Sequence, residues 1–286
     1  TWTYHIEASV HNKGTAYAVF EGHSSGDMKP YAYKTSDYGQ TWTNIISDDV
    51  VGFARNIQED YVNPDLLFLG TEFGLYITID GGKSWAKFTN NIPSVAVHFI
   101  ELQKRTNDVV MGTHGRGVII IDDISPLRSI TTEILSKKIH FFDSEPTVMV
   151  DQSGSFGNGF GAETQFVGSN PSRAAQIKYL LPKLHTFGKM ELEIQDLDGK
   201  KIATIGPGKS KGINIVNWNY SIKQPKVAKG KTFSFGGFTS PRVKAGQYKA
   251  VITKGKESFE HVFEVVYDEH SGLTHQEREL KYNTTM

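Results

Sequence analysis

His114 and Arg116 are the pair of residues with the most suggestive chemistry in this sequence. Gly115 separates them and Gly117 follows. A titratable imidazole beside a guanidinium can hold a carboxylate, because arginine donates parallel hydrogen bonds and histidine changes charge near neutral pH. The alternative is a tight turn in which Arg116 pairs with a neighbouring element, and the two glycines favour this interpretation.

Three further residues are weaker candidates for ligand binding. Arg55 and His98 lie in two segments that have the pattern of strands, and Glu72 lies in a turn that corresponds to the turn of His114. His98 alternates with apolar neighbours, which favours an ordinary strand residue over a catalytic one. We expect these residues and the His114 turn to lie where strands and loops converge on one ligand site.

The sequence contains no recognisable catalytic or metal-binding constellation. Glycoside hydrolysis needs two carboxylates about 5–10 Å apart. Asp122 and Asp123 are adjacent, but neighbouring residues on a strand point to opposite faces, so they are poorly placed for such a pair. His-Glu-x-x-His, Gly-x-Ser-x-Gly and EF-hand patterns do not occur. We predict no cofactor and no metal site, and aspartates near glycines leave a structural Ca²⁺ ion as an open alternative.

A repeated turn sets the elements that must position these residues. Its two copies have aspartates 43 residues apart and read Thr35-x-Asp37-x-Gly39-x-Thr41-Trp42 and Thr78-x-Asp80-x-Gly82-x-Ser84-Trp85. We expect a shortened third copy at Thr1-Trp2, and the pair Gly70-Thr71 recurs 42 residues later as Gly112-Thr113. Repeats of about 40–50 residues in strand-rich segments are typical of β-propeller blades.

The chemistry of this turn predicts a structural role for its aspartate. An aspartate between two strands accepts hydrogen bonds from the backbone of its own turn, and the glycine supplies a positive φ. The hydroxyl groups bind further turn atoms, and the tryptophan anchors the next strand in the core between sheets. We therefore interpret Asp37 and Asp80 as structural rather than catalytic.

The strand patterns predict an all-β chain with four segments. Residues 1–125 are expected to form the last blades of a propeller, in three units of which the third has three strands. Residues 126–162 form a connector with a short helix over 127–136 and a flexible glycine-rich loop over 151–169. Residues 163–267, with about seven short strands and Trp218 to fill the space between sheets, predict an immunoglobulin-like sandwich. Residues 268–286 form a polar helical tail.

Three blades cannot close a ring, because known propellers need at least about four. An open ring would leave strand edges and blade faces in water. We therefore expect the remaining blades on N-terminal sequence outside this chain or on another chain.

Composition limits the function classes. The 286 residues include 31 basic and 31 acidic side chains, so no net charge draws the protein to nucleic acid or an anionic membrane. There is no cysteine, which excludes disulfides and thiolate chemistry. No apolar run approaches the about 20 residues of a membrane span. These features fit a secreted, periplasmic or cell-surface bacterial protein.

Several stretches resemble sortilin-like or BNR-repeat (Asp-box) β-propeller proteins, large secreted bacterial proteins usually classed as glycosyl hydrolases. GTEFGLYITIDGGKSW is similar to their blade motif, GTHGRGVIIIDDISPLRSI to their propeller exit, and GSNPSRAAQIKYLL to their sandwich entry, where Ser172 replaces a more usual proline. GINIVNWNY and PRVKAGQYKAVI resemble later sandwich strands of the fibronectin III or hook-cap type. The resemblance implies that the chain is a C-terminal fragment of such a protein.

Two functions of different class stay open. In the first, the chain is a non-enzymatic binding or scaffold part that recognises a protein or glycan partner. In the second, it belongs to an exo-acting glycoside hydrolase, sialidase-like or glucanase-like, whose catalytic carboxylates lie mostly on other blades. A sialidase-like site needs an arginine cluster, and Arg55, Arg105 and Arg116 show no such pattern. We favour binding, because a propeller serves binding as readily as catalysis.

Overall fold

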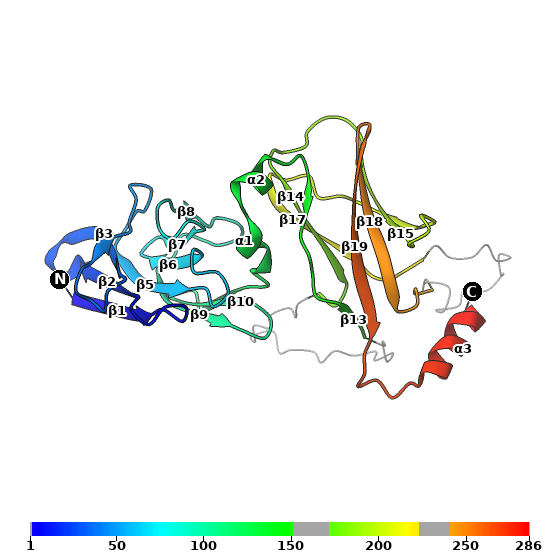
Figure 1. Cartoon of the computed structure of the whole chain (residues 1–286), viewed down its shortest axis with the longest axis horizontal. Coiled ribbons are helices and arrows are strands. Elements are labelled where there is room, and N and C mark those ends of the chain that lie inside the picture. The colour runs from blue at the N-terminus through cyan, green and yellow to red at the C-terminus, as the bar shows by residue number, and fades with distance from the viewer. Residues whose placement is uncertain (1, 151–171, 223–240, 286) are drawn as a thin grey trace. The chain divides into compact units, whose positions relative to one another are not determined.

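The chain is a mostly β protein that divides into two compact units, Thr1–Ile130 and Thr131–Met286 (Figure 1). The computed structural model describes residues 2–150, 172–222 and 241–285. The all-β class agrees with the sequence prediction. The predicted glycine-rich loop over 151–169 lies outside the described residues.

The first unit consists of three antiparallel sheets in which consecutive strands pair in chain order. The first sheet contains β1 (Trp2–Ala8), β2 (Ala16–Gly22), β3 (Asp27–Thr35) and β4 (Thr43–Asn44), with the short 3-10 helix η1 (His23–Ser25) between β2 and β3. The second contains β5 (Ala54–Glu59), β6 (Leu67–Thr71), β7 (Gly74–Thr78) and β8 (Ala86–Lys87). The third contains β9 (Val97–Gln103), β10 (Asp108–Thr113) and β11 (Val118–Ile121), and α1 (Ser125–Ser129) follows it.

Alternating side chains build one core on each face of the second sheet. Leu67 and Leu69 of β6 pack in a cluster with Tyr17 and Val19 of β2, whereas Phe68 of β6 packs in a second cluster with residues of β9 and β10. Successive side chains of a strand point to opposite faces, so β6 lies between two apolar layers. The three sheets are therefore packed face to face in sequence order.

Buried polar contacts join the first two sheets. The Tyr17 hydroxyl donates a hydrogen bond of 2.8 Å to Glu59 Oε1, and the Val10 N–H donates to Glu59 Oε2 at 3.1 Å. Burial, followed by the hydrogen bond to Glu59, raises the pKa of Tyr17. Each buried polar atom here has a partner, so the contact does not leave an unsatisfied group.

A buried ion pair attaches α1 to the second and third sheets. The Arg128 guanidinium donates to both carboxylate oxygens of Asp60, at 2.9 and 2.8 Å, and lies 4.6 Å from the centre of the Tyr61 ring. It also donates to Asn107 Oδ1. Asp60 is fully buried, so the bidentate pairing supplies the partner that a buried carboxylate requires.

The second unit contains a three-stranded and a five-stranded sheet. The first has the order β12 (His140–Phe141), β14 (Ala175–Leu181), β17 (Gly212–Trp218). The second has the order β13 (Thr147–Met149), β19 (Glu257–Tyr267), β18 (Gly246–Lys254), β15 (Met190–Gln195), β16 (Lys201–Ile205), and only β13 pairs in parallel. Two helices, α2 (Thr132–Ser136) and α3 (His275–Thr285), flank these strands in the sequence.

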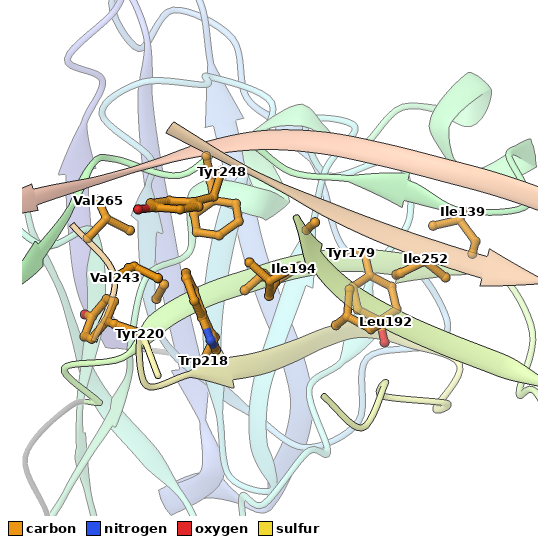
Figure 2. Packing of buried hydrophobic residues seen from close by; sticks show 14 of the residues in the cluster. Ile139, Tyr179, Leu192, Ile194, Trp218, Tyr220, Val243, Tyr248, Ile252 and Val265 are labelled. Atoms are coloured by element: carbon orange, nitrogen blue, oxygen red, sulfur yellow. The ribbon is translucent and has the colours of Figure 1, made fainter. Parts of the chain in front are cut away.

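Trp218 lies in the centre of the core of the second unit (Figure 2). Its indole is 1% exposed and packs edge-on against Tyr248 and Phe263, with ring centres 5.5 and 5.9 Å away. Because Trp218 belongs to one sheet and its two ring partners to the other, it fills the space between sheets as the sequence predicted. Edge-to-face aromatic packing adds about 0.5–1.5 kcal/mol per pair beyond the area buried.

Two expectations about local structure were wrong. Trp2 opens β1 and pairs with Glu21, whereas Trp42 and Trp85 stand just before the short last strands β4 and β8, so Trp2 does not have the place that the copy expected at Thr1-Trp2 requires. The single helix expected over 127–136 is two helices, α1 and α2, because Ile130 is extended after the first and the Thr131 side chain caps the second. Within the expected tail over 268–286, α3 begins at His275, after a capping box of Thr274 and Glu277.

Candidate functional site

The two Asp turns have the same hydrogen bonds. In the first turn Asp37 accepts from the Thr41 N–H at 2.9 Å, from the Thr41 hydroxyl at 2.6 Å and from the Thr35 hydroxyl at 2.8 Å. In the second turn Asp80 accepts from the corresponding Ser84 N–H, Ser84 hydroxyl and Thr78 hydroxyl at 3.0, 2.6 and 2.6 Å. Gly39 and Gly82 have φ of 84° and 94°, a conformation that glycine adopts without strain.

These carboxylates are used by their own turns. Hydrogen bonds from Thr41 hold the pKa of Asp37 at about 2. Burial opposes ionisation of Asp80, but hydrogen bonds from Ser84 and Thr78 prevail and also hold its pKa at about 2. Each turn follows the third strand of its sheet, next to the start of the second strand. The turns therefore lie at one end of the sheets, and Tyr4, Arg55 and His98 lie towards the opposite end.

The tryptophans of the two turns differ, and the prediction that both lie in the core was wrong for one of them. Trp85 is 4% exposed and donates to the Ile45 carbonyl of the preceding sheet's last segment at 2.6 Å. Trp42 is 41% exposed and donates to Gly39 of its own turn at 3.2 Å. Trp85 is buried because a preceding sheet covers it, and no sheet precedes the first one in the described residues.

A β-bulge in the first strand of each sheet of the first unit marks the candidate site. The pairing of the first and second strands shifts register around Tyr4, around Arg55 and around His98, each of which is the extra residue. A bulge bends the strand and re-aims the side chain of the extra residue, and bulges are common next to functional sites. The three sheets thus present a tyrosine, an arginine and a histidine at equivalent places.

The middle strands supply a second set of equivalent residues. Glu21 is the penultimate residue of β2, Glu72 follows β6 and His114 follows β10. The hairpin pairings Ala8–Ala16 and Glu59–Leu67 give an offset of 51 residues between the first two sheets, which places Glu21 at the position of Glu72. The sequence analysis missed Glu21 and Tyr4, because this offset differs from the 43-residue spacing of the Asp turns.

Arg55 is held between aromatic rings and an acidic side chain. Its guanidinium lies 4.7 Å from the Tyr4 ring centre and 4.9 Å from that of Phe53. Its Nη1 lies 3.3 Å from Glu21 Oε2. His23 approaches the same oxygen at 3.0 Å and stacks on Phe53 at 4.8 Å. Aromatic rings attract a guanidinium through their π electrons, so Arg55 is fixed in place and is 13% exposed.

His98 and His114 form a second part of the site. Their rings stack with centres 5.3 Å apart, and the His114 N–H donates to the Ala96 carbonyl at 2.9 Å. Burial lowers the pKa of His98, and the positive charges of Arg55 and His114 lower it further, against an opposing effect of Glu21. The stacked imidazoles are the contribution of the third sheet to the candidate site.

Glu72 and Arg116, the other two predicted site residues, have different surroundings. The Glu72 N–H donates to the Phe53 carbonyl at 3.1 Å, and its buried Oε2 has no hydrogen-bond partner in the described part of the chain. Arg116 is exposed and has no ion pair with any described residue. The favoured interpretation, that Arg116 pairs with a neighbouring blade, stays a prediction.

A cluster of carboxylates lies at the opposite end of the third sheet. Burial raises the pKa of Asp122, and the charges of Asp108 and Asp123 raise it further. Asp108 accepts the Asp123 N–H at 3.0 Å, and Asp123 accepts the Ser125 N–H at 3.0 Å at the start of α1. β10 separates Asp108 from His114 by its full length, about 17 Å or more at about 3.4 Å per residue, so this cluster is not part of the candidate site.

The described residues contain no group of three or more histidine, aspartate or glutamate side chains that could hold a metal ion. No helix among them is long and apolar enough to cross a membrane. The strand ends carry a mixed polar and aromatic set of side chains: one half-buried arginine, two glutamates, three imidazoles and two further aromatic rings. This site and the face-to-face sheets define an all-β protein whose candidate ligand site is composite, with parts from three sheets.

Comparison with known proteins gives distant structural neighbours. No known family profile and no curated protein matches the chain. An ancestral GH74 enzyme is 18% identical over 40% of this chain and 14% of its own, with a TM-score of 0.34. The Niastella koreensis GH74 enzyme is 17% identical over 42% and 21%, with a TM-score of 0.36. The extracellular domain of a protein assigned as a one component system of B. thetaiotaomicron is 10% identical over 90% and 36%, with a TM-score of 0.21.

Proposed function

We propose that the three sheets of the first unit are consecutive blades of an Asp-box β-propeller, and that the second unit is an immunoglobulin-like sandwich. The 42- and 43-residue repeats and the equal hydrogen bonds of the two Asp turns support this architecture. The face-to-face packing of successive sheets in chain order supports it as well. A secreted, periplasmic or cell-surface bacterial protein of the sortilin-like or BNR-repeat kind fits these features.

Further blades would cover the two outer faces of this unit. Ile6 on the first sheet is 63% exposed, and Phe99 and Val118 on the third are 64% and 66% exposed. Gly112 in the third sheet corresponds to Gly70 in the second. A Cβ at Gly70 would lie only 2.7 Å from the Val97 carbonyl oxygen of the next sheet. At Gly112 the nearest atoms belong to Phe99 of its own sheet. We propose that blades from other sequence of the protein, or from another chain, pack on these faces.

The function proposed for this propeller is recognition of a protein or glycan partner without catalysis. The equivalent bulges at Tyr4, Arg55 and His98 carry this proposal, together with the Arg55 guanidinium that lies 4.7 Å from the Tyr4 ring centre. A rigid arginine with aromatic surfaces and imidazoles provides both hydrogen bonds and stacking surfaces for a polar ligand. The carboxylate of Glu21 is used in contacts with Arg55 and His23, which leaves it poorly suited to act as a general base.

Glycoside hydrolysis is the second candidate, and one observation favours it. The buried Glu72 Oε2 lacks a hydrogen-bond partner among the described residues, and a buried carboxyl group of this kind can act as a general acid. Its counterpart would be a carboxylate on another blade. No cofactor is proposed for either function.

Binding to a printed glycan array, together with reducing-sugar release from the glycans that bind, tests the two functions. We expect Arg55→Ala to abolish binding, whereas Arg105→Ala, a change of an exposed arginine at the opposite end of the third sheet, leaves binding unchanged. Sugar release that disappears in Glu72→Gln would replace the binding proposal with the enzymatic one. Equal binding by the two arginine variants would show that the strand ends are not the site.

A further inference from the structure

Three connections meet at one end of the second unit, and all of their charged side chains are basic. Residues 182–189 join β14 to β15, residues 206–211 join β16 to β17, and residues 255–256 join β18 to β19. Together they contain five lysines, one histidine and no acidic residue: Lys183, His185, Lys189, Lys209, Lys211 and Lys256. We call these three segments the basic loop end.

Hydrogen bonds show that the basic loop end is one surface. The His185 N–H donates to the Lys209 carbonyl at 2.9 Å, which joins the first segment to the second. The Gly255 N–H donates to the Lys189 carbonyl at 3.3 Å, which joins the third segment to the first. In Figure 1 the β18–β19 hairpin reaches the upper end of the second unit in the view. All five lysines are exposed.

Two apolar side chains stand out among these lysines. Phe187 is 89% exposed and Leu184 is 59% exposed. The loop that carries them is ordered by the His185 ring, which lies 3.2 Å from the Gly188 carbonyl oxygen. A large exposed aromatic side chain on a held loop that also carries lysines has no role in the core of this unit. The β15–β16 connection carries Asp196 and Asp198 beside Lys200, so it lacks the uniformly basic character of the basic loop end.

We propose that the basic loop end docks on an anionic lipid surface, with Phe187 and Leu184 inserted among the headgroups and the lysines against them. Aromatic and aliphatic side chains insert about 5–10 Å into this region of a bilayer, and nearby lysines are attracted by anionic lipids. Lysine carries its charge on a flexible apolar stem that extends along such a boundary. A nucleic acid is a less suitable occupant, because its phosphates favour arginine forks, which these segments lack, and Leu184 cannot stack on a base.

Co-sedimentation with vesicles of phosphatidylcholine, with or without phosphatidylglycerol, tests this docking. We expect binding only to the vesicles with phosphatidylglycerol and a loss of binding at high salt. The double variant Phe187→Ser and Leu184→Ser should bind at least about tenfold more weakly than the parent. The double variant Lys209→Glu and Lys256→Glu should weaken binding by a similar factor. The matched controls are Leu197→Ser, 52% exposed on the acidic connection, and Lys13→Glu with Lys200→Glu, both exposed; these should bind like the parent.

A spectroscopic measurement separates insertion from simple charge attraction. The emission of a Phe187→Trp variant should shift to shorter wavelength when anionic vesicles are added, whereas that of Leu197→Trp should not. All of these positions are exposed, so thermal unfolding should match the parent and exclude misfolding. Equal binding to neutral vesicles, unchanged binding by the serine variant, or stronger capture by heparin or single-stranded DNA without dependence on Phe187 would overturn the proposal.

Discussion

The Asp turns at 35–42 and 78–85 are chemically the same and energetically different. Both use the same pattern of hydroxyl, amide and carboxylate hydrogen bonds. Their tryptophans are 41% and 4% exposed. The motif therefore determines the turn by local chemistry, whereas the neighbouring sheet determines how much the tryptophan contributes to stability. Equivalent positions in a repeat are equally stable only where they have equivalent neighbours.

Removal of the two indoles should give the largest difference between the turns. We expect Trp85→Ala to lower the free energy of unfolding of the first unit by about 3–5 kcal/mol, because it opens a cavity in a packed core. Trp42→Ala should cost about 0.5 kcal/mol or less, as an exposed change does. Urea denaturation followed by circular dichroism measures both. These losses are expected for the 286-residue chain alone, without the proposed additional blades. Losses of equal size would mean that Trp42 is already covered within this chain.

The two equivalent glycines should give the next largest difference. Gly70→Ala would place a Cβ 2.7 Å from the Val97 carbonyl oxygen, and we expect a loss of about 1–3 kcal/mol from overpacking. Gly112→Ala meets only Phe99 at 3.6 Å, an ordinary contact, and should leave the unfolding free energy almost unchanged. The same denaturation series compares them. A strongly destabilising Gly112→Ala would indicate that another sheet lies against the third one.

The parts of the fold that sequence could predict are those with local causes. The Asp turns were predictable because Thr35, Asp37 and Gly39 act within one turn, and Trp218 because a lone tryptophan in alternating strands fits between sheets. Trp42 was wrongly predicted to be buried. The eight-residue motif does not encode which sheet lies beside it. The existence of a preceding sheet is a property of the assembly rather than of eight residues.

The candidate site was predictable in part for the same reason. Arg55, His98 and His114 were found from strand patterns and a glycine turn, and the structure brings His98 and His114 into contact. The bulges that aim Tyr4 and Arg55 were not predictable, since an extra residue in a strand leaves no clear signal in a single sequence. Glu21 was missed because the first sheet has a longer β3 and a helical turn, which change the offset to its counterpart Glu72.

The carboxylates of the two turns should respond alike to acid. Both have a pKa near 2, below the usual 3.8 of aspartate. A lowered pKa in the folded state contributes stability above the unfolded value, and that contribution is lost as the pH falls from about 4 to about 2. We expect Asp37→Asn and Asp80→Asn each to flatten this part of the stability curve equally. Urea unfolding at several acid pH values measures the free energy of unfolding of both variants. A much larger effect of Asp80→Asn than of Asp37→Asn would show that burial of Trp85 strengthens its own turn.

His98 should give the smallest effect and extend the comparison to the site. Its pKa lies below the usual 6.5, because burial and then the charges of Arg55 and His114 disfavour its cation, while Glu21 opposes them. The unfolded chain therefore binds more protons than the folded one below about pH 6.5, so stability rises with pH through this window and is fully present above it. His98→Gln should reduce that slope. Histidine titration by NMR would identify the group directly, and a normal or raised pKa for His98 would mean that Glu21, rather than Arg55, determines the field at the strand ends.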